Sequence, residues 1–249
     1  MKQIMEEKAQ NYKNGKINYV TEKVVKDSTI TLTINNEISR SLSAIEDSLE
    51  EFAVGYLFNE NMVKSIDDIE KIEINENHIN VEIDDKLLKT KETVLCSDSS
   101  GGWRSKIKEI EPIISDFQVE ADELINRIEE LKNNAQIWQA TGGTHVAGIV
   151  YKNNFIVKED VSRHVAVDKV IGYGILHDYD LSNSYVIYSG RMPADMVIKI
   201  VRAGIPVLAS NAAPAYSGCE TAKKGNVTLV GFLRGQRFNV YNNKNRIIF

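Results

Sequence analysis

Short runs in the first third of the chain alternate apolar and polar residues. The runs at residues 30–34, 71–74 and 79–83 each show this alternation, which is the period of a half-buried antiparallel strand. Asn35-Asn36 and Glu76-Asn77 stand where turns are needed. The pattern predicts a small sheet in the N-terminal part of the chain.

One amphipathic helix interrupts these strands. Between Leu49 and Leu57, apolar residues recur at the spacing of a single helical face. Ser48 and Glu51 match the Ser-x-x-Glu capping box that starts a helix. We therefore expect residues 1–90 to form a smaller α+β N-terminal subdomain.

The residue composition changes over residues 91–135. A polar, glycine-containing stretch at 96–102 comes first, and a charged pattern around 121–131 follows. This composition predicts a mobile loop and then one or two solvated helices.

Strand and helix patterns alternate from residue 136 to residue 249. Pro193 suits the first turn of one of these helices, and Gly204 suits the position just past its end. A β-α-β-α-β run predicts an α/β core with a mostly parallel sheet and right-handed crossovers. The expected elements are strands at 184–188, 205–209 and 227–233, and helices at 193–203 and 217–223.

Three loops follow the strands of this run, at the edge where open α/β sheets bind ligands. Two of the three carry arginines, Arg191 in one and Arg234 and Arg237 in another, beside glycines and a helix start. Guanidinium groups donate paired hydrogen bonds to an anion such as phosphate, and a helix N-terminus supplies free N–H groups. The arginines are therefore candidate anion-binding residues, with solvated surface arginines as the alternative.

A second cluster of polar groups lies at residues 158–164, where a further helix is expected to start. Its carboxylates, guanidinium and imidazole suit an acid–base pair or an anion site. They suit helix capping and a structural salt bridge equally well. Asp168 and Lys169, on the first turn, fit either interpretation.

A glycine pair precedes the strand expected at 146–150. Residues 141–145 read Thr-Gly-Gly-Thr-His, and the glycines allow a ligand to approach the backbone closely. No Gly-Lys-Ser/Thr follows, so this is not a phosphate-binding P-loop, and a tight turn is the alternative. His145 joins the candidate residues at this place.

Composition narrows the possible partners. The 249 residues are 43% hydrophobic and 26% charged, with a net charge of −5, which argues against nucleic acid or an anionic membrane as the main partner. The first thirty residues lack the apolar stretch of a signal peptide, and no apolar run approaches membrane-spanning length. We expect a cytoplasmic protein.

The number of cysteines limits which disulfides and metal sites the chain can form. Cys96 and Cys219 are the only two cysteines, which excludes a disulfide framework and a cysteine-rich zinc site. The His-x-Glu and Pro-Cys-x-x-Cys strings that zinc deaminases need are absent. No metal site is expected.

Several stretches, in the same order along the chain, resemble the FdhD family of formate dehydrogenase accessory sulfur carriers. Shorter matches at 53–58 and 66–69 extend the resemblance into the N-terminal part. The main matching stretches are 141–145, 159–170, 189–191, 202–208 and 231–241.

The resemblance implies a cytidine-deaminase-like core without zinc, and a homodimer. It implies a carrier that takes sulfur from a cysteine desulfurase as a persulfide and delivers it to the molybdenum cofactor of formate dehydrogenase. That cofactor is bis-molybdopterin guanine dinucleotide, which GDP-like ligands mimic. Together with the candidates above, the cofactor-binding residues expected are Phe232, Leu233, Arg234, Gly235, Gln236, Arg237, Arg191, His164 and His145.

The chain departs from the family pattern in the sulfur-carrying loop. Family members carry Ser-Ser-Cys-Gly-x-Cys-Gly, whereas residues 99–105 read Ser-Ser-Gly-Gly-Trp-Arg-Ser. Both motif cysteines are missing. Ser162 also replaces a usual glycine, Val165 replaces a usual asparagine, and residues 213–217 are altered.

Cys96, five residues before Gly101 in the same loop, is the candidate catalytic thiol. A persulfide carrier needs an accessible thiolate, which Arg104 would favour and Asp98 would oppose. The alternative is a loop cysteine without a role, because a free cysteine often acts as a small apolar residue. Cys219 is expected to pack. Two functions stay open: a sulfur carrier, and a molybdenum-cofactor-binding chaperone or insertase without sulfur transfer.

Overall fold

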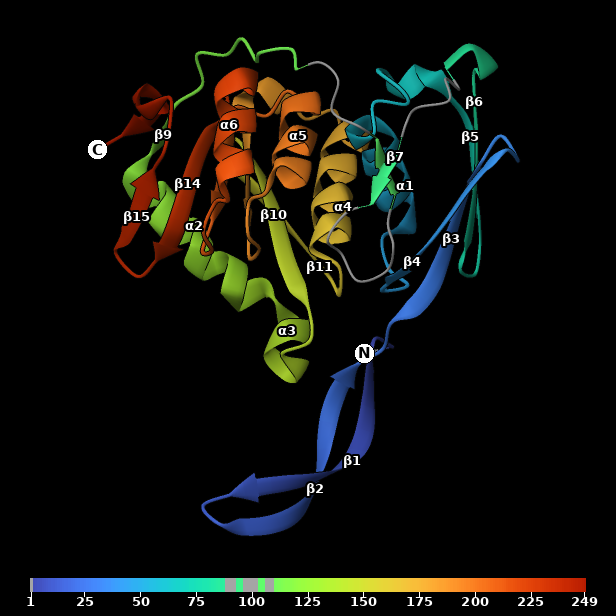
Figure 1. Ribbon diagram of the computed structural model, residues 1–249, viewed down its shortest axis with the longest axis vertical. Helices are drawn as coiled ribbons and strands as arrows, with labels where there is room; N and C mark the ends of the chain where they lie inside the picture. The colour runs from blue at the N-terminus through green and yellow to red at the C-terminus, as the bar shows by residue number, and fades with distance from the viewer. Residues whose placement is uncertain (1, 88–92, 96–102, 106–109) are drawn as a thin grey trace.

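The computed structural model describes residues 2–87, 93–95, 103–105 and 110–249. A six-stranded sheet of order β11-β10-β12-β13-β14-β15 forms its centre (Figure 1). The strands are β10 His145–Tyr151, β11 Asn154–Asp160, β12 Ser184–Tyr188, β13 Val207–Ser210, β14 Thr228–Arg234 and β15 Arg237–Val240. One face is covered by α4 Arg163–Leu176, α5 Ala194–Arg202 and α6 Tyr216–Gly225, and the other by α2 Ala121–Asn134.

The expectation of a mostly parallel sheet was wrong, because the sheet is mixed. β12, β13 and β14 run parallel as predicted, whereas β10 with β11, β10 with β12, and β14 with β15 are antiparallel. Tight turns at Lys152-Asn153 and Gly235-Gln236 cause the difference, since a short turn joins only antiparallel neighbours. The expected cytidine-deaminase-like core stays a prediction.

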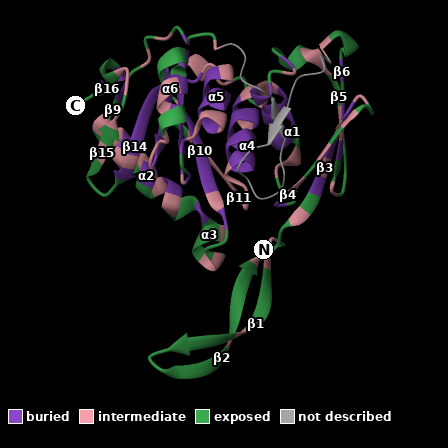
Figure 2. Cartoon of the chain, in the orientation of Figure 1, coloured by how far each residue is buried: buried purple, intermediate pink, exposed green. Residues whose placement is uncertain are grey.

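Successive residues of β12 belong to different cores. Tyr185 and Ile187 pack on the α2 side, and Val186 and Tyr188 pack on the side of α4, α5 and α6. Strand β12 is buried along its whole length, which explains its continuous apolar run. The sheet is therefore the middle layer of three (Figure 2).

α2 is amphipathic rather than solvated all round, which corrects the expectation for this segment. Three apolar residues at i, i+4 and i+7 face the sheet and are buried, while the charged residues face outward. A short helix, α3 Gln136–Thr141, follows it. The buried residues of α2 are Leu124, Ile128 and Leu131.

The C-terminal end of the chain lies beside the start of α2. β16 Ile247–Ile248 pairs in parallel with β9 Val119–Glu120, directly before that helix. Ile247 is buried, and the buried Arg246 donates from Nη1 to the Pro206 carbonyl at 3.1 Å. The last residues thus form part of the α2 layer.

A second sheet, of order β4-β3-β6-β5, packs on α1 Leu49–Asn59. The three strands and two turns predicted from the alternation are confirmed, with Asn35, Asn36 and Glu76 at positive φ. A two-stranded pair, β7 Thr93–Leu95 and β8 Trp103–Ser105, is also present. The four strands are β3 Ser28–Ile34, β4 Ile38–Ala44, β5 Ile69–Asn75 and β6 His78–Ile83.

The predicted capping box at Ser48 was wrong, although the helix after it is confirmed. Ser48 has a left-handed backbone (φ 53°), and its side chain makes no capping hydrogen bond. Its hydroxyl instead accepts from Lys158 Nζ at 2.7 Å, because β11 lies beside this end of α1. A capping box is present instead between Ser65 and Asp68.

Helices α1 and α4 touch backbone to backbone through two glycines. A Cβ atom at Gly55 would lie 1.9 Å from the Asp168 carbonyl oxygen, and one at Gly172 would lie 1.8 Å from the Glu51 carbonyl oxygen. Each glycine fits because it has no side chain. This contact joins the N-terminal unit to the central sheet.

A β-hairpin at the N-terminus extends away from the rest of the molecule (Figure 1). β1 Ile4–Lys13 pairs with β2 Lys16–Val25 in one uninterrupted antiparallel register. The turn is Asn14-Gly15, both at positive φ. Asn-Gly is a strong sequence signal for a two-residue hairpin, and this hairpin was not among the elements expected above. In the part of the chain that the structure describes, no helix is long and apolar enough to cross a membrane.

The glycine contact between α1 and α4 predicts an unusual response to alanine. Gly172→Ala should lower the free energy of unfolding by about 2–3 kcal/mol, because the new methyl group meets rigid backbone. The change would be measured by urea denaturation followed by circular dichroism.

Gly174→Ala on the same helix is the matched control. A Cβ there meets no backbone: its nearest neighbours are the side-chain ends of Ile149 and Leu181 at 3.1 Å and Tyr179 Cβ at an ordinary 3.6 Å, so the change should stay within about 1 kcal/mol. Alanine normally stabilises a helix interior, so a Gly172→Ala protein as stable as the parent would contradict the close approach.

Candidate functional site

Three loops at one edge of the central sheet are joined by hydrogen bonds. The Ser210 hydroxyl donates to the Gly190 carbonyl at 2.7 Å, which links the loops after β13 and β12. Met192 N–H donates to the Ala213 carbonyl at 3.1 Å, and Phe232 N–H donates to the Ala212 carbonyl at 3.0 Å. The loops that sheet topology predicted to converge therefore do meet.

Phe232 lies on β14, within the strand expected at 227–233, and the strand continues to Arg234. The pairing of β14 with β15 shifts register between Gly231 and Arg234, and Phe232 has φ 55° within this irregularity. A bulky residue in the left-handed region is strained, and bulges of this kind often direct side chains at binding sites. The Arg234 guanidinium carbon lies 5.6 Å from the centre of the Phe232 ring.

The other predicted residues of this segment differ in accessibility. Leu233 is fully buried on the α2 side of the sheet, so its side chain belongs to the core. Gly235 (φ 56°) and the exposed Gln236 form the turn to β15. Arg191, Arg234 and Arg237 are exposed and are accessible to an anionic ligand at this edge of the sheet.

A cavity of about 230 Å³ opens beside the converging loops, between the sheet edge, α2 and α3. His145 at the start of β10 and Ser189 after β12 lie on one wall, with His145 Nδ1 3.4 Å from Ser189 Oγ. Trp138 of α3 forms part of the other wall, a role that no local sequence signal indicated. Further lining residues are Leu131, Thr144 and Asn211.

Two effects lower the pKa of His145. Burial is the larger, since it disfavours the charged imidazolium, and the positive charge of Arg163 is the second. Both effects favour the neutral imidazole, which offers one donor and one acceptor nitrogen. Because the folded-state pKa is depressed, this group costs stability as the pH falls through the unfolded-state value of 6.5.

Glu159 holds the rim of the cavity in place. Its carboxylate accepts from the backbone N–H groups of Ile137 at 2.8 Å and Trp138 at 2.7 Å, which satisfies two free donors at the start of α3. The same carboxylate accepts from the Thr144 hydroxyl at 2.9 Å. The residue before His145 is thus fixed to the helix that carries Trp138.

His164 lies beneath this edge and does not line the cavity. Its side chain is fully buried near the start of α4, with Nε2 3.5 Å from Asp195 Oδ2 at the start of α5. The contact links the N-termini of the two helices that follow β11 and β12. His164 is therefore buried, unlike the exposed arginines at this edge of the sheet.

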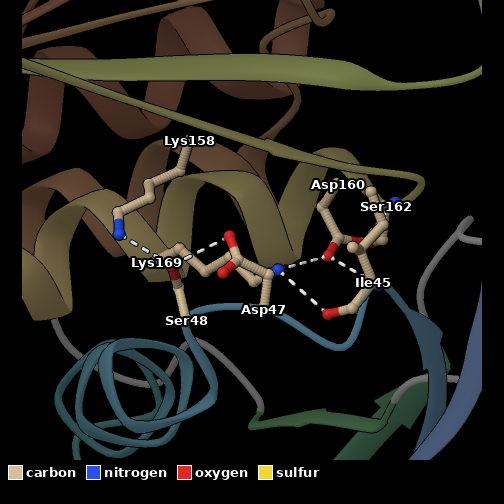
Figure 3. Close-up of polar contacts among 7 residues, drawn as sticks. All are labelled: Ile45, Asp47, Ser48, Lys158, Asp160, Ser162 and Lys169. Carbon is tan, nitrogen blue, oxygen red and sulfur yellow. Dashed lines mark hydrogen bonds and ion pairs between the residues drawn. The ribbon is translucent and has the colours of Figure 1, made fainter. Parts of the chain in front are cut away.

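Asp160, in the 158–164 cluster, ties three segments together (Figure 3). Its Oδ2 accepts from Lys169 Nζ at 2.8 Å and from Ile45 N–H at 3.0 Å, and its Oδ1 accepts from Ser162 N–H at 2.9 Å. Burial raises the pKa of Asp160, while Lys169 and the two amides oppose that shift. The geometry matches the structural salt bridge interpretation of this cluster, whereas Ser162 at the start of α4 makes no side-chain capping hydrogen bond.

A second buried ion pair joins Asp168 of α4 to Lys199 of α5. Asn59, the last residue of α1, donates from Nδ2 to the same carboxylate at 2.5 Å. All three side chains are shielded from solvent. Asp168 and Lys169 therefore each take part in a buried structural ion pair, Asp168 with Lys199 and Lys169 with Asp160.

The two cysteines fall in different parts of the chain. Cys96, the predicted catalytic thiol, lies outside the described residues. Cys219 on α6 is half-buried and packs against the core, as expected. Within the described ranges, no three His, Cys, Asp or Glu side chains gather as a metal-binding group.

The electrostatics of the cavity can be tested on His145. Its pKa, followed by NMR titration of the imidazole protons, should lie below the ordinary value of 6.5, and Arg163→Gln should raise it by removing a nearby positive charge. A His145 pKa at or above 6.5, or one insensitive to Arg163→Gln, would refute this account.

Known proteins resemble this chain over most of its sequence. A model described as the FdhD/NarQ family matches residues 25–248. "Sulfur carrier protein FdhD" of Methanothermobacter thermautotrophicus is 48% identical over 230 residues, 92% of this chain and 93% of the relative. "Protein FdhD" of Methanocaldococcus jannaschii is 34% identical over 231 residues, 92% of each chain.

A solved structure extends the likeness to three dimensions. A crystal structure named for a formate dehydrogenase accessory protein of Desulfotalea psychrophila superposes with a TM-score of 0.82 at 27% sequence identity, covering 98% of this chain and 99% of that one. The family match, the relatives and the shared fold all span nearly the whole sequence. The chain therefore belongs to the FdhD/NarQ family.

Proposed function

We propose that this protein carries sulfur, as a persulfide, from a cysteine desulfurase to the molybdenum cofactor of formate dehydrogenase, in the cytoplasm. The observation that carries the proposal is the meeting of three segments at one sheet edge, two of them bearing arginines, beside a cavity, in a chain 48% identical to a protein named as a sulfur carrier. The cofactor enters this scheme as the substrate that receives sulfur.

The residues at the edge fit a guanine dinucleotide. Arg191, Arg234 and Arg237 supply exposed guanidinium groups for its phosphates. The Phe232 ring, with the Arg234 guanidinium above it, suits stacking of a planar heterocycle. The neutral imidazole of His145 adds a hydrogen-bonding group on the cavity wall.

Cys96 is the proposed sulfur carrier. In the loading step, its thiolate attacks the outer sulfur of the desulfurase persulfide, one S–S bond forms, and the S–S bond of the desulfurase breaks. The desulfurase cysteine leaves as a thiolate, so the step needs no external oxidant or reductant. Cys96 is one of only two thiols in the chain, which makes the assignment directly testable.

Mass spectrometry tests the loading step. After incubation with a cysteine desulfurase and cysteine, the protein should gain one sulfur atom on the peptide that contains Cys96. Cys96→Ser should abolish this gain and the ability to support formate dehydrogenase activation.

Cys219→Ser is the matched control for Cys96→Ser. Cys219 packs against the core from α6, so its replacement should leave both loading and activation in place. Activation by the Cys96→Ser protein equal to that by the parent would remove the sulfur-carrier mechanism.

The absence of both motif cysteines favours a second candidate function, a chaperone or insertase that binds the cofactor without transferring sulfur. It uses the same arginine-bearing edge and predicts that formate dehydrogenase activation is independent of Cys96. The Cys96→Ser experiment therefore separates the two functions.

Both candidates predict guanine-nucleotide binding at the sheet edge. GDP should bind the parent protein in isothermal titration calorimetry, and Arg234→Gln or Arg237→Gln should weaken binding about tenfold through loss of a charge-assisted hydrogen bond. Lys152→Gln removes one exposed positive charge from the β10–β11 turn, at the opposite edge, and should have little effect. Equal loss in all three variants would point to net charge alone and not to this site.

A further inference from the structure

The short helix α3 forms part of one wall of the cavity without being packed into the molecule. Its lining residue is Trp138, which is 44% exposed. None of the six residues of α3 is buried. Among the described elements, its main contact is with the end of β2, which belongs to the N-terminal hairpin and not to the central sheet. Burial of apolar surface therefore contributes little to holding α3 in place.

The backbone on both sides of α3 allows a pivot. Ala135, between α2 and α3, has φ −81° and ψ 73°, so a non-helical residue separates the two helices (Figure 1). Gly142, directly after α3, has φ 66°, and a second glycine follows it. A Cβ at Gly142 would meet no atom within 4 Å. Hinges consist of such residues at the ends of elements, where a few dihedral angles absorb the motion of a rigid piece.

One carboxylate connects α3 to the central sheet. Glu159 lies on β11 opposite Val146 of β10, so the sheet fixes its backbone. Its Oε1 accepts from Ile137 N–H at 2.8 Å, and its Oε2 accepts from Trp138 N–H at 2.7 Å. Hydrogen bonds to a charged acceptor are about twice as strong as neutral ones. Because Oε2 also accepts from the Thr144 hydroxyl at 2.9 Å, Glu159 sets the distance between Trp138 and the opposite wall.

Other hydrogen bonds described for α3 stay close to the helix. Gln139 Nε2 donates to two carbonyls in the last turn of α2, at 2.6 and 3.1 Å, beside the first hinge. Gly142 N–H donates to the Trp138 carbonyl at 2.7 Å, inside the helical turn itself. A pivot of α3 therefore breaks the bonds to Glu159 and leaves the bonds inside α3 intact.

We propose that α3 is a lid over the cavity and that Glu159 is the residue that positions it in the closed state. In the closed state, Trp138 narrows the mouth of the cavity of about 230 Å³. When the bonds to Glu159 break, α3 pivots away and a ligand enters. The polar groups of His145, Ser189 and Asn211 stay on the body. Closure then encloses the ligand, excludes water and slows release.

The ligand of the lid is the guanine nucleotide proposed above, so this part rests on the proposed function. The motion itself does not, because the hinges and the bonds to Glu159 belong to the protein without ligand. Measurements on the ligand-free protein therefore decide on the lid even if no nucleotide binds.

Fluorescence of Trp138 tests the lid in the ligand-free protein. Trp103→Phe removes the only other tryptophan and gives the parent for this experiment. Glu159→Gln keeps the shape of the side chain but removes its charge and one acceptor oxygen. Because Trp138 is 44% exposed when the lid is closed, quenching by acrylamide should rise, by about twofold when opening is complete. The matched control is Glu220→Gln, which removes an exposed ion pair with Lys223 on α6 and should leave quenching at the parent value.

Hydrogen exchange followed by NMR separates a pivot from local unfolding. In Glu159→Gln, the Gly142 amide should keep the protection that it has in the parent, because its bond lies inside α3. A Gly142 amide that exchanges as fast as the Trp138 amide would show that α3 has unfolded, and the lid would be wrong. Quenching that is unchanged in Glu159→Gln, or raised equally in Glu220→Gln, would overturn it too.

Stopped-flow mixing with GDP tests the lid with ligand, with Trp138 emission as the signal. If opening limits entry, Glu159→Gln should raise both the association and the dissociation rate constant, each at least about threefold. A rise in the dissociation rate constant alone would indicate a lost wall contact and contradict the lid. If the parent does not bind GDP, the proposed nucleotide site fails, and quenching and exchange decide on the lid.

Discussion

The carboxylate of Asp160 is the point on which the arrangement of the two halves depends. A buried charge is tolerated only when its partners surround it, and here those partners come from the segment before α1, the residue before α4 and α4 itself. Removing one partner of such a pair typically costs about 3–5 kcal/mol. The ends of β11 and β4 and the start of α4 are thereby held in one geometry.

α4 transmits that geometry to the sheet edge. Its glycine contact with α1 permits the close approach, and the ion pair of Asp168 with Lys199 fixes α5 beside it. The helix begins at Arg163, whose charge acts on His145 across the edge. The accessible residues of the candidate site therefore stand on elements whose positions are set by polar contacts in the interior.

Local sequence patterns predicted the strands and helices well. They predicted poorly which strands are neighbours in the sheet and which charged residues form ion pairs. The strands and helices between residues 184 and 233 follow from periodicity and from Pro193 and Gly204, and topology brought their loops together. The antiparallel neighbours of β10 could not be read from strand composition, because the short turn at Lys152-Asn153 sets the direction of β10 against the strands beside it. Asp168 and Lys169 were ambiguous, since a charged residue on a helix gives no local sign that its partner is buried.

The pairing of β16 with β9 has a consequence for how the molecule is made. Ile247 and Ile248 follow α2 only after the whole central sheet has been synthesised, yet they complete the layer that contains α2, and α2 forms one wall of the cavity. Domains generally fold from the N-terminus as the chain emerges from the ribosome. The α1 unit can gain its own core early, but the α2 wall of the cavity takes its final form only after residues 247 and 248 have left the ribosome.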